Sequence, residues 1–232
     1  MYSRQMPIIG NECQKLIKRS RIAVAGLGGL GCNVITHTAS AGVGEMILID
    51  DQFIAESDLN RQFVYSRKDI GKKKTELSAQ WIKRINPDTK ITKMNVHIDD
   101  DSIKELSSCD LIVDCLDNYE ARMAINRYAF SNNTKIVHGA VESMFGHVTV
   151  VIPNVTPCLE CIIPNRVVKE VPSISPAVGL IGALQAAEVI KMLTGRFSPL
   201  SGKLLTVDVS DNSYNIADIK KNDMCACCSK KN

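Results

Sequence analysis

The chain has 232 residues, of which 45% are hydrophobic, and this is enough for one domain with a sizeable core. Its 28 basic and 25 acidic residues nearly balance, which argues against a nucleic-acid-binding or membrane-surface protein. We expect no apolar run long enough to cross a bilayer, and residues 1–10 lack the apolar stretch of a signal peptide. Nine cysteines without an export signal favour thiols or a metal site in a cytoplasmic protein.

The first part of the chain alternates short apolar runs with helical patterns. Residues 21–25 are predicted to form a buried strand, residues 32–41 a helix, and residues 46–50 a second buried strand. Such a unit requires parallel strands joined by a right-handed crossover. Further along the chain, the patterns predict helices over 75–85 and 120–131 and strands over 90–97, 111–115 and 135–139.

The last third of the chain has a different pattern. Strands over 146–152 and 203–209 are expected to be antiparallel, and residues 179–193 form an apolar helix rich in small residues. Residues 165–175 and the tail from Asp211 are the least patterned stretches. The sequence therefore predicts an α/β protein of Rossmann-like class, with a mostly parallel sheet, helices on both faces and antiparallel C-terminal strands.

A glycine-rich turn, with glycines at 26, 28, 29 and 31, separates the first predicted strand from the first predicted helix. In nucleotide sites such glycines allow a tight turn and let backbone N–H groups approach a phosphate at the helix N-terminus. Asp50 closes the second strand, where an acid accepts hydrogen bonds from ribose hydroxyls. The pattern predicts nucleotide binding; the alternative is a structural turn with Asp50 as a cap. No P-loop pattern accompanies the turn.

Polar residues follow several of the predicted strands. They are Ser57, Asn60 and Arg61 in a loop, Lys74 before a helix, and Asp114, Asp117 and Asn118 at a strand end. Because ligands of open parallel sheets bind at the carboxyl ends of strands, we expect the glycine turn, Asp50, Arg61 and Asp117 to converge on one crevice. Cations there would neutralise phosphate charge, and a carboxylate would hold Mg²⁺. The alternatives are a solvated helix start for Lys74, a surface salt bridge for Arg61 and a helix cap for Asp117 and Asn118.

A series of short motifs runs along nearly the whole chain. The motifs are Ser3-Arg4-Gln5, Gly26-Leu-Gly-Gly-Leu-Gly31, Ala41-Gly-Val-Gly44, Asp50, Asn60-Arg61-Gln62, Gly71-x-x-Lys74, Arg84-Ile-Asn-Pro87, Asp114-Cys-x-Asp117-Asn118, Pro157-Cys158-x-x-Cys161 and Gly182-x-Leu-Gln185-Ala-x-Glu188-x-Ile-Lys191. Together they resemble the ThiF/MoeB/HesA family, the bacterial relatives of ubiquitin-activating enzymes, and they occur in the order of that family.

The resemblance implies that the chain binds ATP and Mg²⁺. Gly29 would bind phosphate through its backbone, and Asp50 would hold the ribose. Arg61 and Lys74 would contact the phosphates of ATP, and Asp117 would bind Mg²⁺. The other residues of the implied nucleotide site are Gly26, Gly28, Gly31, Ser57, Asn60 and Asn118.

The resemblance also implies partners. Arg4 is similar to an arginine that reaches ATP from the other subunit of a homodimer, so an intact site would require dimerisation. Residues 1–232 would form a single adenylylation domain, with a nucleotide-binding half at about 20–140 and a carrier-binding and zinc part at about 141–232. The substrate would be a ThiS- or MoaD-like ubiquitin-fold sulfur-carrier protein that ends in Gly-Gly.

The implied reaction is adenylylation of the carrier's C-terminal carboxylate with release of pyrophosphate, in thiamin or molybdopterin-type cofactor biosynthesis. The attacking carboxylate is already anionic, so the reaction needs positioning and charge neutralisation but no general base. Three alternatives stay open: activation of a peptide or a tRNA by an enzyme of the same family, a non-catalytic nucleotide-binding partner, and an NAD-dependent oxidoreductase.

Two cysteine pairs lie at opposite ends of the last third, Cys158-x-x-Cys161 and Cys225-x-x-Cys228. Four thiolates in two such pairs match a closed, tetrahedral Zn²⁺ site that would attach the C-terminal tail to the domain. Cys227 is a possible but poorer partner for Cys225. The resemblance supports zinc, since members of the family often carry it here; the alternative is a tail of free thiols.

Residues 167–176 contain no cysteine, although some relatives carry one there for thioester or persulfide chemistry. We therefore expect the enzyme to stop at the acyl-adenylate, with sulfur supplied by another protein such as a cysteine desulfurase. Residues 165–175 are a candidate crossover loop over the carrier's tail. The histidines are scattered and are interpreted as core or surface residues; they are His37, His97, His138 and His147.

Overall fold

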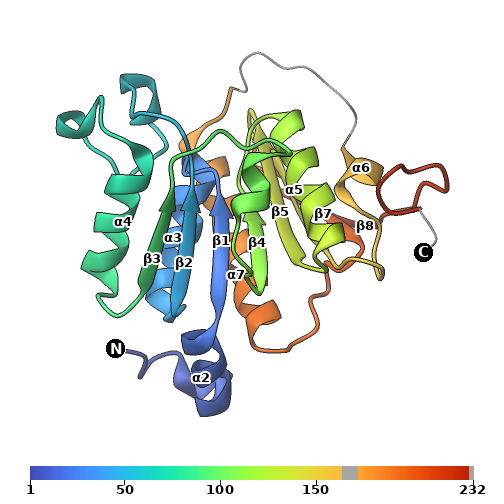
Figure 1. The fold of residues 1–232 in the computed structure, drawn as a ribbon, viewed down its shortest axis with the longest axis horizontal. Helices are drawn as coiled ribbons and strands as arrows, with labels where there is room; N and C mark the ends of the chain where they lie inside the picture. Colours follow the sequence, from blue (N-terminus) through green and yellow to red (C-terminus); the bar gives the residue numbers. More distant parts are fainter. Residues whose placement is uncertain (164–171, 230–232) are drawn as a thin grey trace.

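Eight strands form a single sheet in the computed structural model, which describes residues 1–163 and 172–229. The order across the sheet is β3-β2-β1-β4-β5-β6-β7-β8 (Figure 1). The strands are β1 (Arg21–Ala25), β2 (Glu45–Ile49), β3 (Lys90–Met94), β4 (Leu111–Asp114), β5 (Lys135–Glu142), β6 (Phe145–Val151), β7 (Lys203–Asp208) and β8 (Ser213–Asp218).

The sheet changes direction at β5. Strands β3, β2, β1, β4 and β5 are parallel, and Arg21 of β1 is level with Glu45 of β2. From β5 onward each strand is antiparallel to its neighbour. The predicted fold class is therefore confirmed, and the carboxyl ends of the parallel strands meet at one edge of the sheet.

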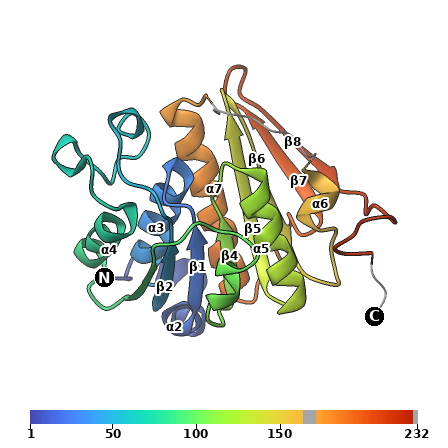
Figure 2. The same ribbon diagram turned by 45° about the horizontal axis from the view of Figure 1, so that its top comes forward.

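Helices cover both faces of the sheet. On one face α3 packs against both α4 and α7, and α5 covers the other face beside α6 (Figures 1 and 2). The helices are α1 (Met6–Ile9), α2 (Asn11–Arg19), α3 (Gly29–Ala41), α4 (Lys74–Ile85), α5 (Tyr119–Ser131), α6 (Leu159–Ile162) and α7 (Ser175–Leu193), with 3₁₀ turns at Glu56–Asp58, Arg67–Asp69 and Ser102–Glu105.

Two apolar cores result from this layering. Successive side chains of a strand point to opposite faces, so Val24 of β1 packs with the α3 side and Ala25 with the α5 side. Both residues are fully buried. The central strands are apolar at nearly every position for the same reason, because helices shield both of their faces from water.

Helix α7 corrects one expectation from the sequence. By length and composition its 19 residues could cross a membrane, although no such run was expected. Half of this apolar window is buried inside the fold, and α7 packs against α3, β5 and β6. The apolar surface of α7 is thus explained by its place in the core.

Helix and strand positions otherwise agree with the predictions to within a few residues, and β1 agrees in full. Helix α3 begins at Gly29 rather than at residue 32, and α7 begins at Ser175 rather than at 179 because Pro176 suits the first turn of a helix. Helix α2 and strand β8 had not been predicted. Every residue of β8 is exposed, so this edge strand lacks the apolar alternation that identifies a strand. The predicted loop over 165–175 lies mostly outside the described residues.

Candidate nucleotide-binding site

The glycine turn connects the end of β1 to the start of α3. Gly26 has a φ of +86°, and a Cβ at this position would lie 2.8 Å from the carbonyl oxygen of Cys115. A Cβ on Gly31 would lie only 2.1 Å from the carbonyl oxygen of Gly26. Gly28 is the N-cap of α3, and helix geometry leaves the N–H groups of the first helical turn, from Gly29 onward, without an intrahelical acceptor. The turn has the form that a phosphate site requires.

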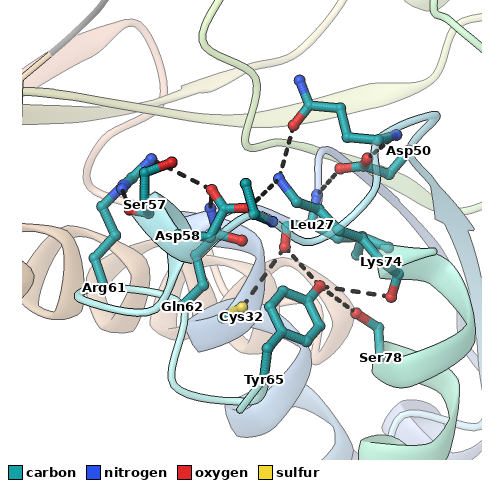
Figure 3. A network of polar contacts seen from close by, with 12 residues as sticks. Leu27, Cys32, Asp50, Ser57, Asp58, Arg61, Gln62, Tyr65, Lys74 and Ser78 are labelled. Carbon is teal, nitrogen blue, oxygen red and sulfur yellow. Dashed lines mark hydrogen bonds and ion pairs between the residues drawn. The ribbon is translucent and has the colours of Figure 1, made fainter. Parts of the chain in front are cut away.

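Asp50 joins this turn from the end of β2 (Figure 3). Its Oδ2 accepts a 2.7 Å hydrogen bond from the N–H of Leu27, and its Oδ1 accepts a 2.8 Å bond from the N–H of Gln52. Burial raises the pKa of the Asp50 carboxyl, while Lys74 opposes this shift. The predicted ribose-binding acid thus lies beside the predicted phosphate-binding turn.

Lys74 is almost completely buried at the start of α4. Its Nζ donates a 2.7 Å hydrogen bond to Oε1 of Gln52 and lies 3.5 Å from Oδ2 of Asp58. The alternative that Lys74 is a solvated residue at a helix start is therefore wrong. Lys72 and Lys73, which precede it, are exposed to solvent. A buried ammonium group among polar oxygens is typical of a binding site.

Arg61 lies next to the glycine turn. Its Nη1 donates to the carbonyl oxygen of Ser57 at 2.9 Å and to Oδ1 of Asn60 at 3.0 Å, and Nη2 lies 3.8 Å from Asp58. A Cβ placed on Gly29 would be 3.4 Å from Cγ of Arg61. The structure thus places Arg61 beside the turn, with Ser57 and Asn60 as its hydrogen-bond partners, and its ion pair with Asp58 lies in the same place.

Tyr65 contributes to the turn and had not been predicted. Its hydroxyl lies 2.9 Å from the carbonyl oxygen of Leu27 and 2.9 Å from Oγ of Ser78, so it connects the turn to α4. Burial raises the pKa of Tyr65, and the hydroxyl therefore stays protonated as a hydrogen-bond donor. The sequence carries no signal for this contact, because the residues are far apart along the chain and only the fold brings them together.

The acidic residues after β4 differ in their surroundings. Asp114 is completely buried, where Oδ2 contacts Nδ1 of His138 at 2.7 Å and Oδ1 accepts from the N–H of Leu116 at 3.1 Å. Asp117 is exposed, and its carboxylate has no polar partner among the described residues. Asn118 caps α5, where its Oδ1 accepts a 2.9 Å bond from the N–H of Ala121, as the cap interpretation had it. Of these two acids, Asp117 is the one whose oxygens have no partner in the described part of the chain, and it is the candidate for a metal ligand.

A buried polar chain continues from Asp114. Nε2 of His138 lies 3.1 Å from Nε2 of His147, which is on the adjacent strand β6. Burial would raise the pKa of Asp114, but His138 and Arg122 outweigh it and hold this pKa below its usual value. Burial also lowers the pKa of His138 and brings that of His147 to about 3. His138 is thus a satisfied core histidine, as expected, but its link to Asp114 had not been predicted.

Arg4 lies away from the other predicted residues. The side chain of the adjacent Gln5 donates a 2.8 Å bond to the carbonyl oxygen of Ala41, the last residue of α3. The glycine turn is at the opposite end of this helix, about 20 Å away at 1.5 Å per residue. Arg4 is exposed, so within one protomer it does not join the site.

The four predicted zinc ligands lie together between α6 and the C-terminal tail, which Figure 2 shows side by side. The Sγ atoms of Cys158 and Cys225 are 3.4 Å apart, and those of Cys161 and Cys228 are 3.5 Å apart. All four Sγ atoms lie within 4.8 Å of one another. Tetrahedral zinc with Zn–S bonds of about 2.3 Å requires sulfur separations of roughly 3.8 Å, so these thiols fit a structural zinc site.

The fold and the site together define a Rossmann-like nucleotide-binding domain. The ThiF family model matches residues 2–227, and the chain belongs to the ThiF family. The chain is 35% identical to molybdopterin-synthase adenylyltransferase of Escherichia coli, with 98% of this chain and 95% of that protein aligned. It is 30% identical to sulfur carrier protein ThiS adenylyltransferase of Escherichia coli, over 100% of this chain and 95% of that protein.

Another relative and a solved structure extend the comparison. The SAMP-activating enzyme E1 of Haloferax volcanii is 31% identical over 98% of this chain and 87% of that protein. A crystal structure of E. coli MccB with ATP superposes with a TM-score of 0.85 at 24% identity, over 94% of this chain and 69% of that chain. The latter likeness concerns the fold alone. The relatives named here are adenylyltransferases or an activating enzyme, and the chain is an adenylyltransferase of this family.

Proposed function

We propose that this protein uses ATP to adenylylate the C-terminal glycine carboxylate of a ubiquitin-fold sulfur-carrier protein that ends in Gly-Gly. The proposal rests on the grouping of three side chains around the glycine turn: Arg61 beside Gly29, Asp50 on the N–H of Leu27, and Lys74 near Asp50. The names of relatives at 30% to 35% identity, which include adenylyltransferases for a sulfur carrier and for molybdopterin synthase, support the substrate class.

The mechanism follows from charge. ATP would lie with its phosphates at the N-terminus of α3, where the backbone of Gly29 binds them, and with its ribose at Asp50. Arg61 and Lys74 would neutralise the charge that develops as the carrier's carboxylate attacks the α-phosphorus and pyrophosphate departs. No residue is required as a general base, because the attacking oxygen is already ionised.

Asp117 would hold Mg²⁺, since a hard cation prefers oxygen ligands and the carboxylate of Asp117 is exposed without a polar partner among the described residues. The metal would supply further neutralisation of phosphate charge. Cys158, Cys161, Cys225 and Cys228 would hold Zn²⁺, and this ion would stabilise the attachment of the tail to α6. The zinc would serve structure and take no part in the transfer.

The product would be a mixed anhydride of the carrier and AMP, which is activated toward a sulfur nucleophile. We propose that sulfur comes from a separate donor such as a cysteine desulfurase, in thiamin or molybdopterin-type cofactor biosynthesis in the cytoplasm. The absence of cysteine from residues 167–176 supports a reaction that ends at the adenylate.

ATP–pyrophosphate exchange tests the proposal. The purified protein should catalyse exchange only when a carrier with an intact Gly-Gly end is present, and Asp117→Ala should abolish exchange. Asp88→Ala is the matched control, because Asp88 is also exposed and precedes β3 at the opposite edge of the sheet. Exchange without a carrier would refute the proposed reaction. Exchange by Asp117→Ala at the wild-type rate would refute the role of Asp117.

We further propose that Arg4 completes the site of a second copy in a homodimer. The position of Arg4 supports this, because Arg4 lies near the end of α3 that is farthest from the glycine turn of its own protomer. Arg4→Ala and Asp117→Ala should each be inactive as pure dimers. Equal mixing after subunit exchange should restore about a quarter of wild-type activity, since half of the dimers are mixed and each has one intact site. No recovery in demonstrably mixed dimers would refute the shared site.

A further inference from the structure

The carboxylate of Asp58 lies between the two phosphate-binding cations of the proposed site (Figure 3). Its Oδ2 is 3.5 Å from Nζ of Lys74, and its Oδ1 is 3.8 Å from Nη2 of Arg61. Asp58 is 7% exposed. One carboxylate is thus shared by two cations where the triphosphate is expected to bind.

The carboxylate of Asp58 is itself fixed in place. Oδ2 accepts a 3.0 Å hydrogen bond from the N–H of Ala55, and Oδ1 accepts a 2.7 Å bond from Nε2 of Gln62. These two donors hold the carboxylate in its present orientation. Because these hydrogen bonds keep Asp58 in place, a bound triphosphate would draw the two cations away from Asp58 and toward the phosphates.

Neither cation depends on Asp58 for its position. Nζ of Lys74 donates to Oε1 of Gln52 at 2.7 Å, and Nη1 of Arg61 donates to Ser57 and Asn60. The distances to Asp58 are longer than any of these contacts. The influence of Asp58 on the cations is thus chiefly that of its charge.

We infer that Asp58 is the counter-ion of Lys74 and Arg61 when no nucleotide is bound. On binding, the triphosphate replaces Asp58 as the partner of the two cations, and Asp58 competes with pyrophosphate for them as pyrophosphate leaves. This inference rests on the proposed function, because it assumes that the two cations bind phosphate. Asp58 acts through the charge of its carboxylate on the two cations in this scheme and makes no contact with ATP. The negative charge of Asp58 weakens the binding of ATP. The same charge also weakens the binding of pyrophosphate to the two cations, so that this product dissociates more readily.

The substitution Asp58→Asn tests the inference with almost no change of shape. The asparagine can keep its oxygen on the N–H of Ala55. Its Nδ2 can donate to Oε1 of Gln62 after the Gln62 amide rotates, and this oxygen is buried without a partner in the wild-type site. The variant removes one negative charge and leaves the hydrogen bonds of Lys74 and Arg61 to their other partners.

Isothermal titration with a non-hydrolysable ATP analogue and with pyrophosphate, both with Mg²⁺, measures the effect. One unit of charge acting across about 8 Å in a partly solvated site changes an equilibrium constant by roughly 5- to 10-fold. Asp58→Asn should therefore bind both ligands roughly 5- to 10-fold more tightly than the wild type. Damage to the site would weaken binding, so tighter binding distinguishes a charge effect from a structural one.

Two variants serve as controls. Asp51→Asn removes the same charge from an exposed residue whose carboxylate contacts His97 and neither cation, and it should change both affinities less than two-fold. Asp58→Glu keeps the charge and should show no tightening. Asp58→Ser provides a second test of charge removal if Asp58→Asn fails to fold.

The outcomes separate this inference from the proposed function. A wild-type protein that binds no nucleotide would overturn the proposed function and this inference with it. Normal wild-type binding combined with equal or weaker binding by Asp58→Asn and Asp58→Ser would overturn this inference alone.

Discussion

Gly31 provides a sharp test of how the glycine turn is built. A Cβ at this position would lie 2.1 Å from the carbonyl oxygen of Gly26, whereas ordinary contacts begin near 3.4 Å. The methyl group of Gly31→Ala would therefore overlap the backbone by more than an ångström. The obstacle is a backbone oxygen, so no side-chain rotation can relieve the overlap, and either the turn or α3 must shift.

We expect Gly31→Ala to lower the free energy of unfolding by about 3 kcal/mol, at the upper end of the usual cost of overpacking. For a domain of this size, that loss corresponds to a fall of roughly 6–12 °C in the melting temperature. Urea unfolding followed by circular dichroism measures the first quantity and calorimetry the second. Binding of the ATP analogue should also be lost at temperatures where the variant is still folded.

Gly28→Ala is the matched control from the same turn. The nearest atom to a Cβ on Gly28 is Nε2 of Gln62 at 3.7 Å, an ordinary contact, so we expect stability within about 0.5 kcal/mol of the wild type. A Gly31→Ala protein as stable as Gly28→Ala would refute the argument that the close approach of α3 to the turn requires glycine at residue 31.

Three more predictions concern the turn, the buried histidines and the tail. Tyr65→Phe should cost about 1–2 kcal/mol in urea unfolding, because the carbonyl oxygen of Leu27 loses a buried donor; an unchanged midpoint would contradict this. Burial lowers the pKa of His147 to about 3, so the native state binds fewer protons than the unfolded chain once the pH falls below about 6.5. The free energy of unfolding should therefore be highest above that pH and should be about 2 kcal/mol lower at pH 5. His147→Gln should reduce this loss, and equal losses in the wild type and the variant would refute the argument. In the tail, Cys227→Ser should keep one zinc per chain by atomic emission, Cys228→Ser should lose zinc to a mild chelator, and equal loss by both would contradict the ligand set.

Local patterns in the sequence were sufficient to predict the class of fold and several of the side chains that surround the glycine turn. The apolar strands, the glycines at 26 and 31 and the acid at Asp50 are local features, since each depends on residues that are neighbours along the chain. The rule that ligands bind at the carboxyl ends of parallel strands then predicted that Arg61 would reach the turn, as it does. The two cysteine pairs likewise predicted a cluster that the structure contains.

Tertiary structure alone decided which polar groups are buried and with what they pair. Lys74 follows two exposed lysines in sequence, yet it is buried because the loop before α4 folds back over the end of β2 and brings Gln52 to its ammonium group. Asp58 and Tyr65 looked like ordinary loop residues, but they contact the cations and the turn. Burial and pairing are properties of neighbours in space, and sequence patterns report only neighbours along the chain. The charge balance of the site was therefore settled by the fold, whereas its location was already determined by the sequence.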